Sequence, residues 1–263
     1  IPRLDGGPKV AGAEAFGADR IPAGALHVKV IRSRHHRAAF TFGDLAGYAA
    51  RHPGIVRVLT AADIPGRNLY GVLAAFADQP VFAVGETRHR GEAIAAVVGT
   101  RAAIDALDPD EFPVEWSERQ PLLSMDEALA VSAPLIHRNR PGNILVKGHV
   151  ARGDALAALA RSDVTVEAAF ETGYVEHAYI EPEAGWARRV GDRLEMTVST
   201  QSPYLDRDDT AAILGIPKEN VRIIPSACGG GFGSKLDLSV QPFVALAAWL
   251  TGQPAALVYS RPE

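Results

Sequence analysis

Short segments of alternating or continuous apolar residues recur along the chain and predict strands, while amphipathic stretches between them predict helices. In the first half, helices are predicted at 44–50, where Asp44 can cap the N-terminus, and at 101–107, which Asp108-Pro109 would end. The predicted strands of this half are 26–31, 55–59, 93–98 and 112–116. This alternation of strands and helices predicts an α/β or α+β fold.

A second series of elements follows a stretch rich in turn-forming residues. Pro, Gly, Asn and Ser concentrate at both ends of this stretch, so we place a linker at 121–142 between a domain at 1–120 and a domain at 143–263. The helix predicted at 243–250 is apolar throughout and is expected to be buried. The other elements predicted here are strands 143–150, 164–172 and 221–225, a hairpin of 186–190 and 194–200 around Gly191-Asp192, and helices 154–160 and 205–214. Gly215 stands just past the second of these helices and is expected to end it.

The composition is that of an ordinary globular protein. The chain has 263 residues, of which 47% are hydrophobic and 22% charged, which argues against intrinsic disorder. A formal net charge of -4 gives no electrostatic basis for binding nucleic acid or an anionic membrane. The longest apolar run, 243–250, falls short of the about 20 residues that a membrane span needs. Since the N-terminus also lacks the pattern of a signal peptide, we expect a cytoplasmic location, with the periplasm left open.

The single cysteine, Cys228, limits the redox centres that this chain can hold. One thiol cannot form an intrachain disulfide, a four-cysteine zinc site or an iron–sulfur cluster. No histidine lies near Cys228 in the sequence, which argues against a nucleophile. Any redox chemistry would therefore pass its electrons through a cofactor other than an iron–sulfur cluster bound to this chain.

The most unusual segment is 228–235, Cys-Gly-Gly-Gly-Phe-Gly-Ser-Lys, which we call the glycine loop. Glycine-rich backbone is tolerated where φ must be positive or where the main chain approaches a ligand, and free N–H groups there can face an anion. Ser234 stands where both a P-loop and a dinucleotide fingerprint need glycine, which disfavours a nucleotide-binding domain. A tight turn and a ligand-binding loop both remain open.

Three further segments carry polar groups. Gln201, at the end of a predicted strand, offers an amide that donates and accepts, although a helix-entry turn also explains it. The segment 176–183 concentrates three carboxylates and an imidazole, as metal binding or acid–base work requires. The alternation of Glu181 and Glu183 nevertheless favours a solvated strand. The basic cluster at 32–37 lacks interleaved aromatic residues and is interpreted as a surface loop.

Nine short motifs occur in a fixed order along essentially the whole chain. They are RLDG at 3–6, KVAG at 9–12, IRS at 31–33, PGIV at 53–56, LTAADIP at 59–65, RGEAIAAVV at 90–98, HAYIEPE at 177–183, STQ at 199–201 and GGGFG at 229–233. The ordered set resembles the molybdenum-binding subunit of the xanthine oxidase and aldehyde oxidoreductase family of molybdenum hydroxylases. This resemblance implies a hammerhead-like α/β domain up to about residue 120, followed by the first part of a molybdopterin-binding domain.

The resemblance also implies roles for individual residues. Gln201 would direct its amide at an apical ligand of molybdenum, and the backbone N–H groups of Gly231 and Phe232 would face the ligands of the metal and the pterin dithiolene. Gly230 and Gly233 would complete the cofactor-binding loop. The family's catalytic glutamate and most pterin contacts correspond to sequence beyond residue 263, so no catalytic residue is expected in this chain.

The implied reaction is hydroxylation of a carbon next to nitrogen or oxygen in a small-molecule substrate, with electrons passing to 2Fe-2S and FAD centres on other chains or domains. Family members that act on purines carry a glutamate where this chain has Leu236, so the resemblance implies a substrate pocket for an aldehyde or an aromatic N-heterocycle. The chain alone would be inactive without the remaining molybdopterin-domain polypeptide and the iron–sulfur and flavin subunits. An apolar docking surface would then be exposed around 243–250. The alternative is a non-catalytic structural or assembly fragment of such a complex.

Overall fold

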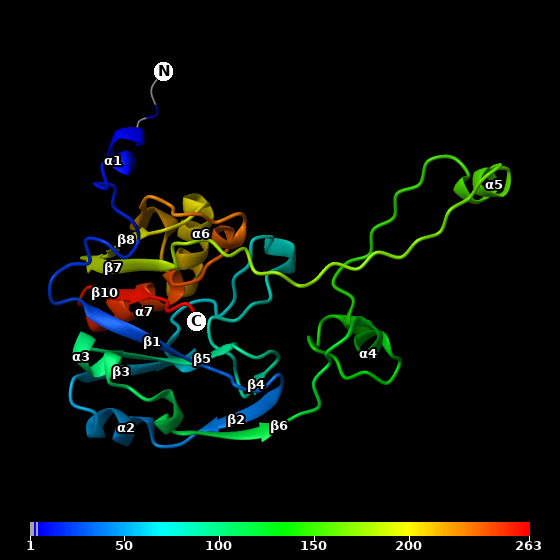
Figure 1. Cartoon of the computed structure of the whole chain (residues 1–263). Coiled ribbons are helices and arrows are strands. Elements are labelled where there is room, and N and C mark those ends of the chain that lie inside the picture. Colours follow the sequence, from blue (N-terminus) through cyan, green and yellow to red (C-terminus); the bar gives the residue numbers. More distant parts are fainter. Residues whose placement is uncertain (1–2, 4) are drawn as a thin grey trace. The chain divides into compact units, whose positions relative to one another are not determined.

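The computed structural model describes residues 3 and 5–263 (Figure 1), so Leu4 of the first motif lies outside the described residues. The chain divides into two compact units. The larger unit combines Ile1–Pro121 with His177–Glu263, and the smaller unit is Leu122–Glu176. One sheet of the larger unit joins strands from both predicted domains, so the sheet itself does not mark a boundary between them. The domain boundaries at 120 and 142 therefore stay a prediction.

A seven-stranded mixed sheet organises the larger unit, in the order β3-β5-β1-β10-β7-β8-β9 (Figure 1). Strands β1 and β10 are parallel and connect the two halves of the sequence, and β8 and β9 form the other parallel pair. The remaining neighbours are antiparallel, including the predicted hairpin of β7 and β8. The strands are β1 Leu26–Arg32, β3 Ile55–Thr60, β5 Ala93–Gly99, β7 Ala184–Val190, β8 Arg193–Val198, β9 Val221–Pro225 and β10 Ala255–Val258.

Two helices, α6 (Pro203–Leu214) and α7 (Gln241–Thr251), pack against this sheet and against each other. Their apolar side chains form the main core together with those of β8. Gly215 ends α6 in the left-handed conformation with φ 66°, as the sequence predicts. The expected apolar docking surface around 243–250 is wrong, because Phe243 through Ala248 are buried in this core. Burying a large apolar side chain stabilises the fold by about 1.5–3 kcal/mol, so α7 has no free apolar face to offer a partner.

A small antiparallel sheet, β4-β2-β6, belongs to the same unit. Its strands are β2 Ala38–Phe42, β4 Glu86–Thr87 and β6 Val114–Glu118. Helix α2 (Leu45–Arg51) packs against β3, and helix α3 (Arg101–Asp105) packs against β1 and β5. The Asp44 side chain caps α2 by accepting a hydrogen bond from Gly47 N at 2.8 Å. A second core cluster fills this region with the aromatic and aliphatic side chains of Phe40, Tyr48, Ile94, Ile104 and Phe112. Mixed sheets with helices confirm the predicted α+β fold.

The smaller unit contains α4 (Met125–Leu129) and α5 (Ala155–Ala160), and α5 is capped by Asp154, which accepts from Ala157 N at 2.9 Å. The strands predicted at 143–150 and 164–172 are wrong. Both stretches are largely extended, but no neighbouring strand in the described chain pairs with them. An apolar alternation predicts a strand only where a second strand supplies hydrogen bonds. A further helix, α1 (Gly6–Val10), lies near the N-terminus.

No helix within residues 3 and 5–263 combines the length and the apolar character that crossing a membrane would require.

Candidate functional site

The glycine loop lies where two parallel strands end together. Strands β8 and β9 run in the same direction, with Val198 paired to Pro225 in the register. Their carboxyl ends therefore meet at one edge of the sheet, the usual place for a ligand site in such an arrangement. The chain after β8 leads to Gln201, and the chain after β9 leads to the loop, so strand direction brings together residues about 30 positions apart.

Gln201 contacts the loop directly. Its Oε1 accepts a hydrogen bond from Gly233 N at 3.0 Å, and its own backbone N donates to Lys235 O at 2.9 Å. A Cβ added to Gly231 would lie 2.4 Å from Gln201 Oε1, so a side chain at this position would displace the Gln201 amide from the loop. The Nε2 group of Gln201 donates to no acceptor among the described residues and remains available to a ligand.

The backbone of the loop presents successive donors. Gly230 and Gly233 have φ values of 104° and 106°, and Phe232, a residue with a side chain, has φ 53°. The left-handed conformation costs a residue with a Cβ about 1–2 kcal/mol, so the fold holds Phe232 there against a local preference. Within the described part of the chain, the N–H groups of Gly230, Gly231 and Phe232 donate to no acceptor. Consecutive unpaired N–H groups in such conformations form a concavity that binds anions.

A buried ion pair stabilises the glycine loop. Lys235 is 2% exposed, and its Nζ lies 2.8 Å from Glu181 Oε2 and 3.0 Å from Ser199 Oγ. Glu181 also accepts hydrogen bonds from Gly229 N at 2.6 Å and from Gly17 N at 2.9 Å. Burial alone would raise the pKa of Glu181, but these hydrogen bonds outweigh it and lower the pKa. Glu181 is therefore a charged anchor for both ends of the loop.

The interpretation of 176–183 as a solvated strand is wrong. The segment forms no strand, Glu181 is paired internally, and Tyr179 is buried and donates to Glu183. A Cβ added to Gly230 would lie 2.8 Å from Tyr179 Cβ, so this segment forms a close neighbour of the loop. Reasoning from residue patterns missed this contact. No group of His, Cys, Asp and Glu in the described chain is arranged to hold a metal ion, so the metal-binding alternative for this segment has no support.

Three carboxyl groups with raised pKa values lie in the segments that follow Gln201 and the glycine loop. Burial raises the pKa of Asp206 to about 6, against lowering hydrogen bonds from Thr200 and Gln241. Burial is also the main cause that raises the pKa of Asp209 and of Asp237. Asp237 directly follows Leu236, which is exposed at the end of the loop, where the substrate pocket is predicted.

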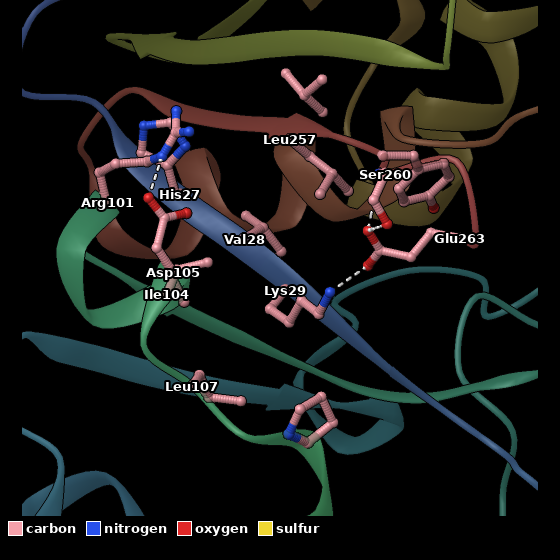
Figure 2. A pocket seen from close by; sticks show the side chains of 13 residues that line it. His27, Val28, Lys29, Arg101, Ile104, Asp105, Leu107, Leu257, Ser260 and Glu263 are labelled. Atoms are coloured by element: carbon pink, nitrogen blue, oxygen red, sulfur yellow. Dashed lines mark hydrogen bonds and ion pairs between the residues drawn. The ribbon is translucent and has the colours of Figure 1, made fainter.

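A cavity of about 440 Å³ lies elsewhere in the larger unit, along β1, α3 and β10 (Figure 2). Figure 2 shows Lys29 reaching Glu263, with Nζ and Oε1 2.8 Å apart, and Arg101 reaching Asp105, with Nε and Oδ2 2.7 Å apart. The charges that line the cavity therefore satisfy one another. None of the residues predicted to bind a cofactor lines it, so the glycine loop remains the candidate site.

Two family models match most of the chain. Residues 11–119 match the aldehyde oxidase and xanthine dehydrogenase a/b hammerhead domain, and residues 136–263 match the molybdopterin cofactor-binding domain. The chain is 35% identical over 262 residues to the nicotinate dehydrogenase large molybdopterin subunit of Eubacterium barkeri, covering 99% of this chain and 60% of that protein. It is 34% identical to a probable xanthine dehydrogenase subunit of Bacillus subtilis, covering 99% of this chain and 34% of the relative.

Solved structures show the same fold. Aldehyde oxidoreductase from Desulfovibrio gigas superposes with a TM-score of 0.87 at 28% identity, over 98% of this chain and 30% of that one. Quinoline 2-oxidoreductase from Pseudomonas putida superposes with a TM-score of 0.87 at 26% identity, over 99% and 34%. The chain thus spans 60% or less of the length of each of these relatives.

Proposed function

Because the chain belongs to the aldehyde oxidase and xanthine dehydrogenase family of molybdenum hydroxylases, we propose that its glycine loop and Gln201 form one wall of a molybdopterin site. The observation that carries this proposal is the row of unpaired N–H groups at Gly230, Gly231 and Phe232. An N–H group that donates to no protein acceptor is available to hydrogen-bond an electron-rich ligand at the loop.

The residues present fit such a group. Molybdenum with its oxygen ligands and the pterin dithiolene would present electron-rich acceptors, and the N–H groups of Gly230, Gly231 and Phe232 together with Gln201 Nε2 offer donors to them. Gly231 leaves the space that a side chain would otherwise fill. Gly230 and Gly233 supply positive φ values, which a residue with a side chain rarely adopts.

When bound, the molybdopterin group supplies the oxidative hydroxylation chemistry, and its electrons leave to 2Fe-2S and FAD centres on other chains or domains. The residues of this chain bind and orient that group, and Lys235 with Glu181 fixes the loop that does so. We assign no catalytic residue to this chain. Activity then requires the remaining molybdopterin-domain polypeptide together with the iron–sulfur and flavin partners.

Leu236 determines the class of substrate in this proposal. Its exposed apolar side chain follows the loop directly and cannot hydrogen-bond the polar edge of a purine. A site without that partner favours an aldehyde or an aromatic N-heterocycle other than a purine. Relatives are named for nicotinate, quinoline and aldehydes but also for xanthine, so the proposal rests on Leu236 and not on their names. Turnover of an aldehyde, nicotinate and hypoxanthine by the native complex tests this assignment. We expect the slowest turnover with hypoxanthine, and a preference for the purine would overturn it.

The cofactor assignment is tested by the molybdenum and pterin content of the native complex. The Gly231→Ala variant places a Cβ against Gln201 Oε1 and is expected to retain at least 10-fold less molybdenum per chain than the wild type. The matched control is Gly148→Ala, because a Cβ at Gly148 meets nothing within 4 Å. Equal molybdenum in both variants would contradict the proposal and favour a non-catalytic assembly fragment.

A further inference from the structure

The segment 163–172 of the smaller unit, which follows α5, is drawn as an extended trace in Figure 1 and has no backbone partners among the described residues. Among the described residues, no backbone N–H or C=O group from Asp163 to Thr172 takes part in a hydrogen bond. The side chains of Val164, Val166 and Phe170 are 80%, 87% and 93% exposed. A backbone so extended, with β-branched and aromatic residues fully in water, has the composition of a strand but not the pairing of one.

The side chains of the 163–172 segment separate into two faces. In an extended chain, alternate residues share a face. The even-numbered face carries Val164, Val166, Ala168 and Phe170, and is apolar up to Thr172. The odd-numbered face carries three acidic residues, Asp163, Glu167 and Glu171. In a solvated linker, nothing favours separate apolar and acidic faces. In a strand with one face on an apolar core and the other toward cationic groups, this separation is expected.

A partner of defined chemistry would satisfy both faces and the backbone. An added strand accepts and donates the main-chain hydrogen bonds, and its alternate side chains provide the specificity. The acidic face calls for Lys or Arg at alternate positions of the partner strand, because opposite charges across a strand pair are stabilising and like charges are destabilising. The apolar face calls for a partner strand that is apolar on its other side.

We propose that residues 163–172 form a strand by pairing with a strand of the remaining molybdopterin-domain polypeptide, which is basic on one face and apolar on the other. The proposal rests on the proposed function. This chain spans 60% of the Eubacterium barkeri large molybdopterin subunit, so that relative has a substantial length of polypeptide with no counterpart in these residues. Burial of the apolar face and pairing of the backbone then make this segment a principal contact between the two parts of the molybdenum-binding unit.

Hydrogen exchange of the complex purified from its native source tests the pairing. We expect the amides of 164–172 to exchange at least 100-fold more slowly than unstructured backbone, whereas the amides of 145–150, which are exposed but lack the two-faced pattern, stay fast. Exchange at the unstructured rate throughout 164–172 would overturn the proposal. Molybdenum is measured in the same sample, so a molybdenum-loaded complex with a fast-exchanging segment contradicts the pairing alone, and a protected segment without molybdenum contradicts the proposed function on which it rests.

A photo-crosslinking residue at position 170 identifies the partner. Crosslinks to an extended, basic and apolar alternating stretch of the molybdopterin-domain polypeptide support the proposal. Crosslinks that map instead to an iron–sulfur subunit, a flavin subunit or a second copy of this chain overturn it.

Charge reversal gives an independent measurement of the acidic face. The double variant Glu167→Lys/Glu171→Lys is expected to weaken assembly of the complex at least 10-fold. The control Asp192→Lys/Glu219→Lys reverses two exposed acids elsewhere on the chain and is expected to assemble normally. Equal assembly of both double variants would contradict the acidic face as part of the interface.

Discussion

The glycine loop and the 163–172 segment are both irregular backbone, but they are held in opposite ways. The loop is anchored by the buried pair of Lys235 and Glu181, and its N–H groups at Gly230, Gly231 and Phe232 donate to no acceptor among the described residues. The 163–172 segment leaves its whole backbone unpaired and exposes a row of apolar side chains. Irregular backbone that is supported from within suits a small electron-rich ligand, whereas unsupported extended backbone with an apolar face suits another polypeptide.

The largest effect is expected when the support of the loop is removed. The Lys235→Met variant leaves the carboxylate of Glu181 buried without its cation, and this should lower the free energy of unfolding by about 3–5 kcal/mol. Urea denaturation of the wild type and the variant measures the difference.

Two controls define that result. Lys147→Met removes an exposed lysine of the smaller unit and should change stability by less than about 0.5 kcal/mol. The double variant Glu181→Gln/Lys235→Met removes both charges and should recover part of the loss, since no unpaired buried charge remains. A loss below about 1 kcal/mol in Lys235→Met would show that the ion pair does not anchor the loop.

A smaller, pH-dependent effect is expected at Asp206. Its pKa of about 6 in the folded protein lies above the ordinary value of 3.8, so its contribution to stability is fully present below pH 3.8 and is lost as the pH rises through about 6. Asp206→Asn stays neutral, so at pH 7.5 the variant should be more stable than the wild type by up to about 3 kcal/mol, and the two should converge near pH 4.

The control for Asp206→Asn is Glu167→Gln, which replaces an acidic residue of the 163–172 segment by its neutral amide. Glu167 is exposed, so its substitution should leave the pH dependence of stability unchanged between pH 4 and pH 7.5. Denaturation midpoints measured across this range separate the two outcomes. A wild-type stability that rises steadily from pH 4 to pH 7.5, with the same rise in Asp206→Asn, would contradict a buried, protonated Asp206.

The sequence predicted those elements whose signals are local. The β7–β8 hairpin follows from Gly191-Asp192 between two alternating runs, α7 follows from a continuous apolar stretch, and the end of α6 follows from Gly215. The glycine-rich composition likewise indicated positive φ, which Gly230 and Gly233 adopt. These features depend on residues close together in the chain.

Contacts between distant segments were not predictable from residue patterns. Glu181 and Lys235 are 54 positions apart, and nothing in the neighbourhood of either one identifies the other as its partner. The parallel pairing of β1 with β10 was not predictable for the same reason, because the two strands are far apart in the sequence. At 164–172 the alternation is real, but a strand also needs a neighbour, and a periodic pattern does not reveal whether one is available.

The most direct test of the central claim is an experimental structure of the molybdenum-loaded complex that contains this chain. We expect ligands of the metal or sulfur atoms of the pterin within about 3–3.5 Å of the backbone N atoms of Gly231 and Phe232, and the Gln201 amide directed at the same group. A cofactor bound away from the glycine loop, with the loop N–H groups paired to protein acceptors instead, would contradict the account.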